Sequence, residues 1–245
     1  MNLNQIFHLG KRYLLHFFFP KTCFCCGCDL SAREEGLLCK TCRDQLRKPG
    51  PHICKRCGVA LRSGGAHCYA CRGSKAKQYK CKIIRSAFVF NASSRALVHA
   101  LKYQQADYTA VYMGKQMMKQ FSTYPELATA DLIIPVPLHP KRKRRRGYNQ
   151  SELLAKAFAK ELGIGADTCS LVRTRDTLSQ TKLGRKGRLE NMVGAFRCVR
   201  PGNVKGKTVL LIDDVATTGA TLEGCAVALK QAGAKQVLAY TFARE

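Results

Sequence analysis

The 245-residue sequence contains no tryptophan and few acidic residues. Its 16 Asp and Glu residues face 42 Lys and Arg residues, which gives a formal net charge of +26. No apolar run approaches the ~20 residues of a membrane-spanning helix, and no small-residue cleavage site follows the short apolar stretch at 13–19. These absences argue against a membrane-spanning or secreted protein. The charge favours a polyanionic partner, nucleic acid rather than a membrane surface, with simple solubility as the alternative explanation.

Cysteine, in contrast, is abundant, and 11 of the 14 cysteines fall within the first 81 residues. In a reducing compartment such clustering favours metal binding over disulfides. Four C-x-x-C pairs occur in succession, with similar gaps between the first two pairs and between the last two. Two such turns complete a tetrahedral zinc site that has no open position, so the expected zinc is structural. The expected ligands are Cys23, Cys26, Cys39 and Cys42 at one site and Cys54, Cys57, Cys68 and Cys71 at the other.

Three alternatives stay open for this region. The cysteine pairs could interleave, one site could be vacant, and Cys25 or Cys28 could substitute in the first site. We expect residues 1–80 to form one unit, with a helix at 3–19 that packs on the main domain or makes at most a peripheral membrane contact. The zinc module either contacts nucleic acid or a partner, or forms a rigid hood over the active site.

The stretch from Val209 to Thr221 organises the remainder of the chain. An apolar strand is followed by Asp213 and Asp214, a hydroxyl-rich loop and an apolar-periodic helix. A helix that begins after such a loop aims backbone N–H groups and its positive end at an anion. Two carboxylates beside a phosphate would repel it unless they face hydroxyls or a divalent cation. A ribose 5-phosphate suits this arrangement, with its phosphate in the loop and its ribose hydroxyls at the two acids. Capping threonines and solvated aspartates are the alternative. The expected phosphate-binding residues are Thr217, Thr218, Gly219, Ala220 and Thr221.

Apolar runs at 83–90, 131–138 and 236–242 predict further strands, and helices are expected near 93–103, 108–121 and 152–162. Ser151 is expected to cap the last of these helices. Lys102 either is solvated or faces the ligand. Strands that alternate with helices predict a parallel α/β sheet, here over residues 81–245.

Six consecutive cations precede Tyr148 and have few acidic residues nearby. We expect them to form a mobile positive arm that either holds pyrophosphate or tracks single-stranded nucleic acid, with Tyr148 as a stacking surface. A solvated loop is the alternative. The cations are Lys141, Arg142, Lys143, Arg144, Arg145 and Arg146.

The strand, acid pair and threonine loop together resemble the phosphoribosyl pyrophosphate (PRPP) motif of type I phosphoribosyltransferases. With the C-x-x-C-Gly knuckles, the Ile134–Leu138 strand end and Arg146-Gly147-Tyr148-Asn149-Gln150, nearly the whole chain resembles the ComF (ComFC) family. The resemblance implies a parallel-sheet type I phosphoribosyltransferase fold preceded by a small zinc-ribbon-like module with four cysteines at each site. It also implies that Val136, Pro137 and Leu138 cradle pyrophosphate and that residues 173–196 form a lid.

The family is associated with natural competence and with the handling of incoming single-stranded DNA in the cytoplasm. The resemblance therefore implies single-stranded DNA, PRPP or a related phosphorylated sugar, and other competence proteins as partners. An active, Mg2+-dependent phosphoribosyltransferase with an unknown acceptor is the alternative. Purine-salvage relatives have an acid where Thr217 stands, so base activation at that position is not expected.

Overall fold

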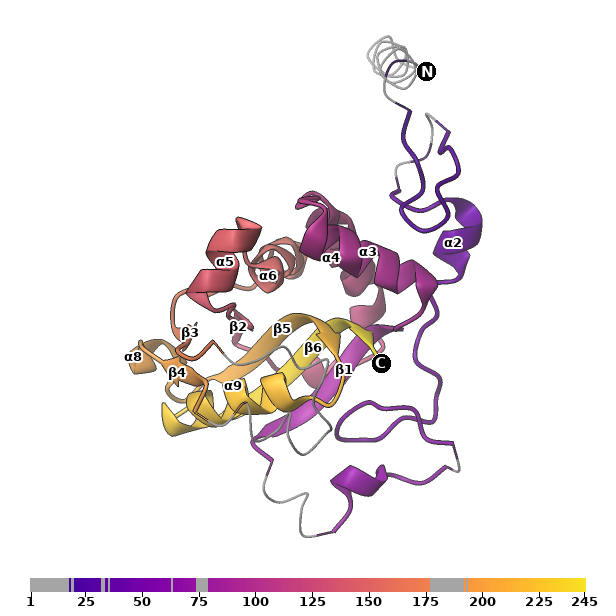
Figure 1. Ribbon diagram of the computed structural model, residues 1–245. Helices are drawn as coiled ribbons and strands as arrows, with labels where there is room; N and C mark the ends of the chain where they lie inside the picture. Colours follow the sequence, from indigo (N-terminus) through magenta and orange to yellow (C-terminus); the bar gives the residue numbers. More distant parts are fainter. Residues whose placement is uncertain are drawn as a thin grey trace.

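A computed structural model describes residues 18, 20–31, 34, 36–62, 64–73, 79–176, 192 and 194–245 (Figure 1). Apart from residue 18, the helix predicted at 3–19 lies outside the described residues, and so does most of the predicted lid. Within them, no helix is both long and apolar enough to cross a bilayer.

A four-stranded sheet forms the centre of the molecule, and its strand order is β1-β6-β5-β2. All three strand pairs are parallel, which confirms the predicted parallel α/β architecture. Nearly every residue of the two middle strands is buried, as expected for parallel strands covered on both faces. The strands are β1 (Cys81–Val89), β2 (Leu132–Pro135), β5 (Thr208–Ala216) and β6 (Gln236–Arg244).

Helices α3 (Ala92–Tyr103), α4 (Thr109–Phe121) and α6 (Gln150–Leu162) cover one face of the sheet (Figure 1). On that face the rings of Phe121 and Phe158 each pack against Tyr240, with ring centroids 5.6 Å apart in both pairs.

The other face carries α9 (Ala220–Gln231) and an antiparallel pair, β3 (Leu171–Arg173) with β4 (Phe196–Cys198). Short elements complete the described chain: α2 (Lys40–Asp44), η1 (Tyr69–Cys71), η3 (Pro125–Leu127), α5 (Pro140–Arg146) and α8 (Pro201–Val204).

Two local predictions are wrong. The six cations form helix α5 instead of a mobile arm: Pro140 stands in the first turn, where it suits a helix, and Gly147 ends the helix at φ 88°. Asn149, not Ser151, caps α6, because the Asn149 side chain accepts a hydrogen bond from the Ser151 backbone N–H at 3.2 Å. The Ser151 hydroxyl is thereby available for another partner.

The two cysteine modules pack on opposite faces of the sheet. Cys23 and Cys42 belong to the apolar core under α3, α4 and α6, whereas Cys54 and Cys57 belong to the core on the α9 side. The second module also joins β1 through its backbone, because the Ile84 N–H donates to the carbonyl of Arg56 at 2.8 Å.

Gly58 permits this close approach between the second module and β1. It lies at φ 71°, and a Cβ there would stand 2.7 Å from the Ile84 carbonyl oxygen. Glycine is therefore needed at this position for both conformation and space.

Candidate functional site

A cavity of about 400 Å³ opens at the carboxyl ends of β2 and β5. This is the edge of a parallel sheet at which ligands of α/β proteins commonly bind. The cavity brings together segments that are far apart in the sequence: the end of α3, the turn after β2, the start of α6, the acids of β5 and the loop that leads into α9. Its lining includes Lys102, Val136, Pro137, Leu138, Arg142, Arg146, Ser151, Arg173, Asp213, Asp214, Thr217, Gly219, Ala220 and Thr221.

The two aspartates lie within β5, which continues to Ala216, and not after its end as the sequence predicted. Asp213 is only 7% exposed. Its Oδ1 accepts hydrogen bonds from the Ser151 hydroxyl at 2.6 Å and from the Asp214 backbone N–H at 2.9 Å. Burial, and then the adjacent Asp214 carboxylate, raise the pKa of Asp213 to about 7. This carboxyl therefore titrates near neutrality.

Lys102 reaches from α3 into the cavity, and its Nζ lies 2.6 Å from Oδ2 of Asp214. Burial disfavours the charged form of Lys102, but attraction to Asp214, and then to Asp213, outweighs burial and raises the pKa of the lysine. The side chain of Asp214 is 4% exposed, so the pair is an inner ion pair of the site. Lys102 is therefore part of the cavity wall and not a solvated lysine.

The loop after β5 leads into α9 at the cavity wall. Gly219 has φ 81° and stands directly before Ala220, the first residue of the twelve-residue helix. The first turn of a helix has backbone N–H groups with no intrahelical acceptor, and it carries the positive end of the helix dipole. Since Gly219, Ala220 and Thr221 line the cavity, this helix end faces the same space as the acids.

Thr218 is placed differently from the other loop residues. Its hydroxyl accepts from the Ala220 N–H at 3.3 Å, and it borders a small hollow with Arg56 and Cys57 of the second cysteine module. The zinc module thus lies directly behind the loop that borders the cavity.

Helix α5 sends two of its six cations to the cavity, Arg142 and Arg146. Arg142 also pairs with Asp176 at 3.2 Å. Tyr148 is partly buried, and its hydroxyl donates to the Leu101 carbonyl at 2.6 Å. That position does not suit Tyr148 for stacking on a base. Lys141, Lys143, Arg144 and Arg145 do not line the cavity.

Sequence reasoning missed Ser151 and Arg173 as site residues. Ser151 meets an acid 62 positions away, and Arg173 reaches the cavity from the short strand β3. Ser151 was expected only as a helix cap and Arg173 only as the first residue of the lid, so the fold is needed to place both in the cavity.

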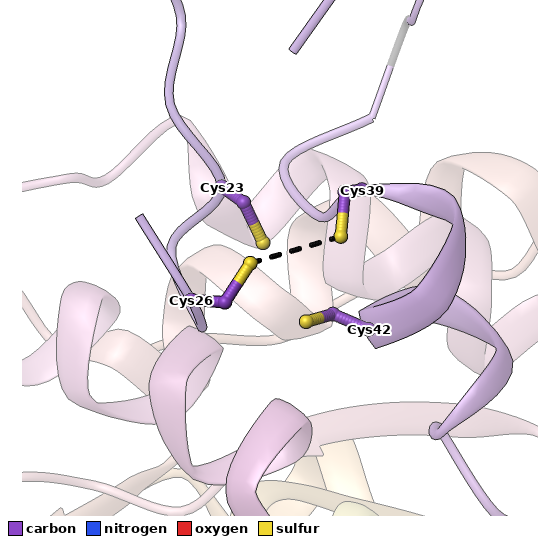
Figure 2. A group of neighbouring side chains, drawn as sticks. All are labelled: Cys23, Cys26, Cys39 and Cys42. Carbon is purple, nitrogen blue, oxygen red and sulfur yellow. Dashed lines mark hydrogen bonds between the residues drawn. The ribbon is translucent and has the colours of Figure 1, made fainter. Parts of the chain in front are cut away.

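Each cysteine module gathers four sulfurs within 4.8 Å of one another. The sets are the expected ones: Cys23, Cys26, Cys39 and Cys42 in the first module (Figure 2), and Cys54, Cys57, Cys68 and Cys71 in the second. A tetrahedral zinc ion with Zn–S bonds of about 2.3 Å separates its sulfurs by about 3.8 Å.

The sulfurs of Cys26 and Cys39 are 3.8 Å apart, and those of Cys57 and Cys68 are 3.7 Å apart. The residues therefore fit two structural zinc ions in tandem, and the interleaved pairing is excluded. Cys25 and Cys28 lie outside the two sets.

Two family models match successive parts of the chain. Residues 14–72 match the family described as "Double zinc ribbon domain", and residues 149–245 match "Phosphoribosyl transferase domain". A solved purine phosphoribosyltransferase from Pyrococcus horikoshii Ot3 is 19% identical, with a TM-score of 0.34 over 55% of this chain and 83% of that chain.

Two curated relatives span nearly the whole chain. "DNA utilization protein YhgH" of Salmonella typhi is 29% identical over 228 residues, which cover 92% of this chain and 97% of the relative. "Competence protein F" of Haemophilus influenzae is 30% identical over 231 residues, which cover 93% of this chain and 98% of the relative. With its double zinc ribbon and its phosphoribosyltransferase domain, the chain belongs to the ComF family of competence proteins.

Proposed function

We propose that this protein acts in natural transformation, where it handles internalised single-stranded DNA in the cytoplasm and binds PRPP or a related phosphorylated sugar in the cavity. The observation that carries the sugar site is the meeting of the acid pair with the start of α9 in one cavity. A phosphate would bind at the helix end, and ribose hydroxyls would bind at Asp213 and Asp214.

The turn at Val136–Leu138 and the guanidinium groups of Arg142 and Arg146 would hold the pyrophosphate of PRPP, because they line the same cavity. Carboxylate and phosphate oxygens are the ligands that Mg2+ prefers, so the acid pair and a bound pyrophosphate suit that ion. Mg2+ would offset pyrophosphate charge and assist its departure.

The DNA role is supported by the net charge of +26 and by the names of the relatives, which refer to DNA utilization and competence. The cationic surface of α5 supplies phosphate-binding groups. Other competence proteins are further expected partners.

An active phosphoribosyltransferase is the second candidate. It is favoured by Asp213, a buried carboxyl with a pKa of about 7 that could move a proton near neutrality. Release of pyrophosphate from PRPP, measured with and without DNA or nucleobases, separates an enzyme from a binding protein.

Thermal unfolding tests the sugar site. PRPP with Mg2+ is expected to raise the Tm of the wild type, and the isosteric double variant D213N/D214N should lose that shift. D167N is the matched control, because Asp167 borders a separate hollow with Gly165 and Lys207. An unchanged wild-type Tm at saturating PRPP would contradict the sugar site.

The DNA role has its own test. Binding of a single-stranded oligonucleotide should weaken steeply with salt, and K141Q/R144Q on the exposed side of α5 should lower the salt slope by about 1.4, because each single-strand phosphate contact contributes about 0.7. K115Q/K119Q removes two exposed charges of α4 and serves as the control. Absence of binding at low salt would contradict this role.

A further inference from the structure

A second hollow of about 210 Å³ adjoins the mouth of the main cavity. Four of its residues also line that cavity, so the two spaces share one wall. The hollow is lined by Lys102, Tyr103, Gln105, Arg142, Arg145 and Arg146, among which four are cations and none is a carboxylate.

Tyr103 gives this hollow an aromatic surface. It is the last residue of α3 and is 66% exposed, unlike Tyr148. The guanidinium carbon of Arg146 lies 5.6 Å from the centre of the Tyr103 ring, and the exposed ring of His99 lies 4.9 Å from it. An exposed tyrosine ring offers a face on which a base can stack, and a neighbouring guanidinium group adds to that attraction.

The cations around Tyr103 differ in whether they already pair with a carboxylate. Lys102 pairs with Asp214, and Arg142 pairs with Asp176. Arg145 is exposed and has no carboxylate partner within the described part of the chain. Arg145 could therefore bind a phosphate of a ligand without breaking an ion pair, beside the exposed ring of Tyr103.

We propose that this hollow binds single-stranded DNA, with an unpaired base stacked on Tyr103 and the flanking phosphates on Arg145 and Arg146. A positive groove with an aromatic platform is the general chemistry of single-strand binding, and stacking requires an unpaired base. The proposal rests on the DNA role proposed above. It places the strand at the mouth of the phosphosugar cavity.

The test measures the Kd of a fluorescent oligo-dT in the zinc-loaded full chain. Y103A should weaken binding about 5- to 150-fold, the range for loss of one stacked base, whereas Y103F should bind like the wild type. Y108A is the matched control: Tyr108 is a similarly exposed tyrosine, at 57%, outside the hollow. R145Q should lower the slope of log K against log salt by about 0.7.

Two outcomes would overturn the proposal while the general DNA role stands. One is equal binding by the wild type, Y103A and Y108A. The other is duplex DNA that binds as tightly as oligo-dT and is insensitive to Y103A. If the wild type binds no DNA at low salt, the DNA role itself fails.

Discussion

The burial of the Asp213 carboxyl should make the stability of the folded protein depend on pH near neutrality. In the unfolded chain this carboxyl has its ordinary pKa near 3.8, and in the folded protein the pKa is about 7. The folded state therefore binds more protons than the unfolded state between these values, so stability falls as pH rises through this window. The full difference of about 3 pH units corresponds to about 4 kcal/mol.

Between pH 6 and pH 8 the Asp213 carboxyl should lower the free energy of unfolding by about 1 kcal/mol. For a chain of this size, that corresponds to a Tm decrease of about 2–4 °C. In D213N the amide oxygen can still accept from Ser151, but this contribution to the pH dependence disappears. D213N should therefore lose less Tm than the wild type between pH 6 and pH 8, while it loses sugar binding.

D167N is the control for this comparison. Burial raises the pKa of Asp167, but four hydrogen-bond donors, led by the Ser170 hydroxyl, outweigh burial and lower this pKa to about 2. Asp167 therefore stays ionised throughout pH 6–8. D167N should keep the wild-type pH slope. The same change in Tm for D213N and the wild type between pH 6 and pH 8 would show that the pKa of Asp213 is not raised, which would refute this description of the site.

Three further predictions concern the frame of the site. Gly219→Ala should lower the free energy of unfolding, measured in urea, by about 1–2 kcal/mol and should weaken sugar binding, because φ is 81° and the new Cβ would lie 3.1 Å from Ile84 Cδ1. Gly163 is the control: it has φ 74° but lies in open space, so Gly163→Ala should lower stability without a change in sugar binding. Arg56→Met should lower the free energy of unfolding by about 3 kcal/mol, because Arg56 pairs with Glu223 of α9 at 3.3 Å and both side chains are nearly buried. Lys40→Met removes an exposed ion pair and should leave the free energy of unfolding almost unchanged. Cys54→Ser should reduce zinc from two ions to one per chain by atomic absorption, whereas Cys169→Ser, outside both clusters, should retain two; two ions in Cys54→Ser would contradict the ligand assignment.

Much of the fold could be predicted from local sequence. The continuous apolar runs identified the buried parallel strands, and the repeated C-x-x-C spacing identified both zinc sites, because each signal is contained in a short segment. The helix ends, in contrast, depend on tertiary contacts. Asn149 and Ser151 are both good capping residues, and only the tertiary partner of Ser151, Asp213, decides between them.

The candidate site was predictable only in its motif residues. The ion pair of Lys102 with Asp214 joins α3 to β5, and no local pattern reports such a contact. The run of cations suggested self-repulsion and a mobile arm. Pro140 and Gly147 at its ends, together with Glu152 against Lys143 and Asp176 against Arg142, support a helix instead.

The sequence pointed to Tyr148 as the stacking residue, whereas we now propose Tyr103, and this difference also arises from tertiary packing. Both tyrosines lie near the cations, but packing hides one ring and exposes the other, and burial depends on the whole fold.

A crystal structure of the zinc-loaded protein with ribose 5-phosphate tests the central claim most directly. We expect the phosphate at the backbone of Gly219–Thr221 and the ribose hydroxyls within hydrogen-bond distance of Asp213 or Asp214. Phosphate density elsewhere, with Lys102 and both aspartates unchanged and the loop empty at saturating ligand, would contradict the account.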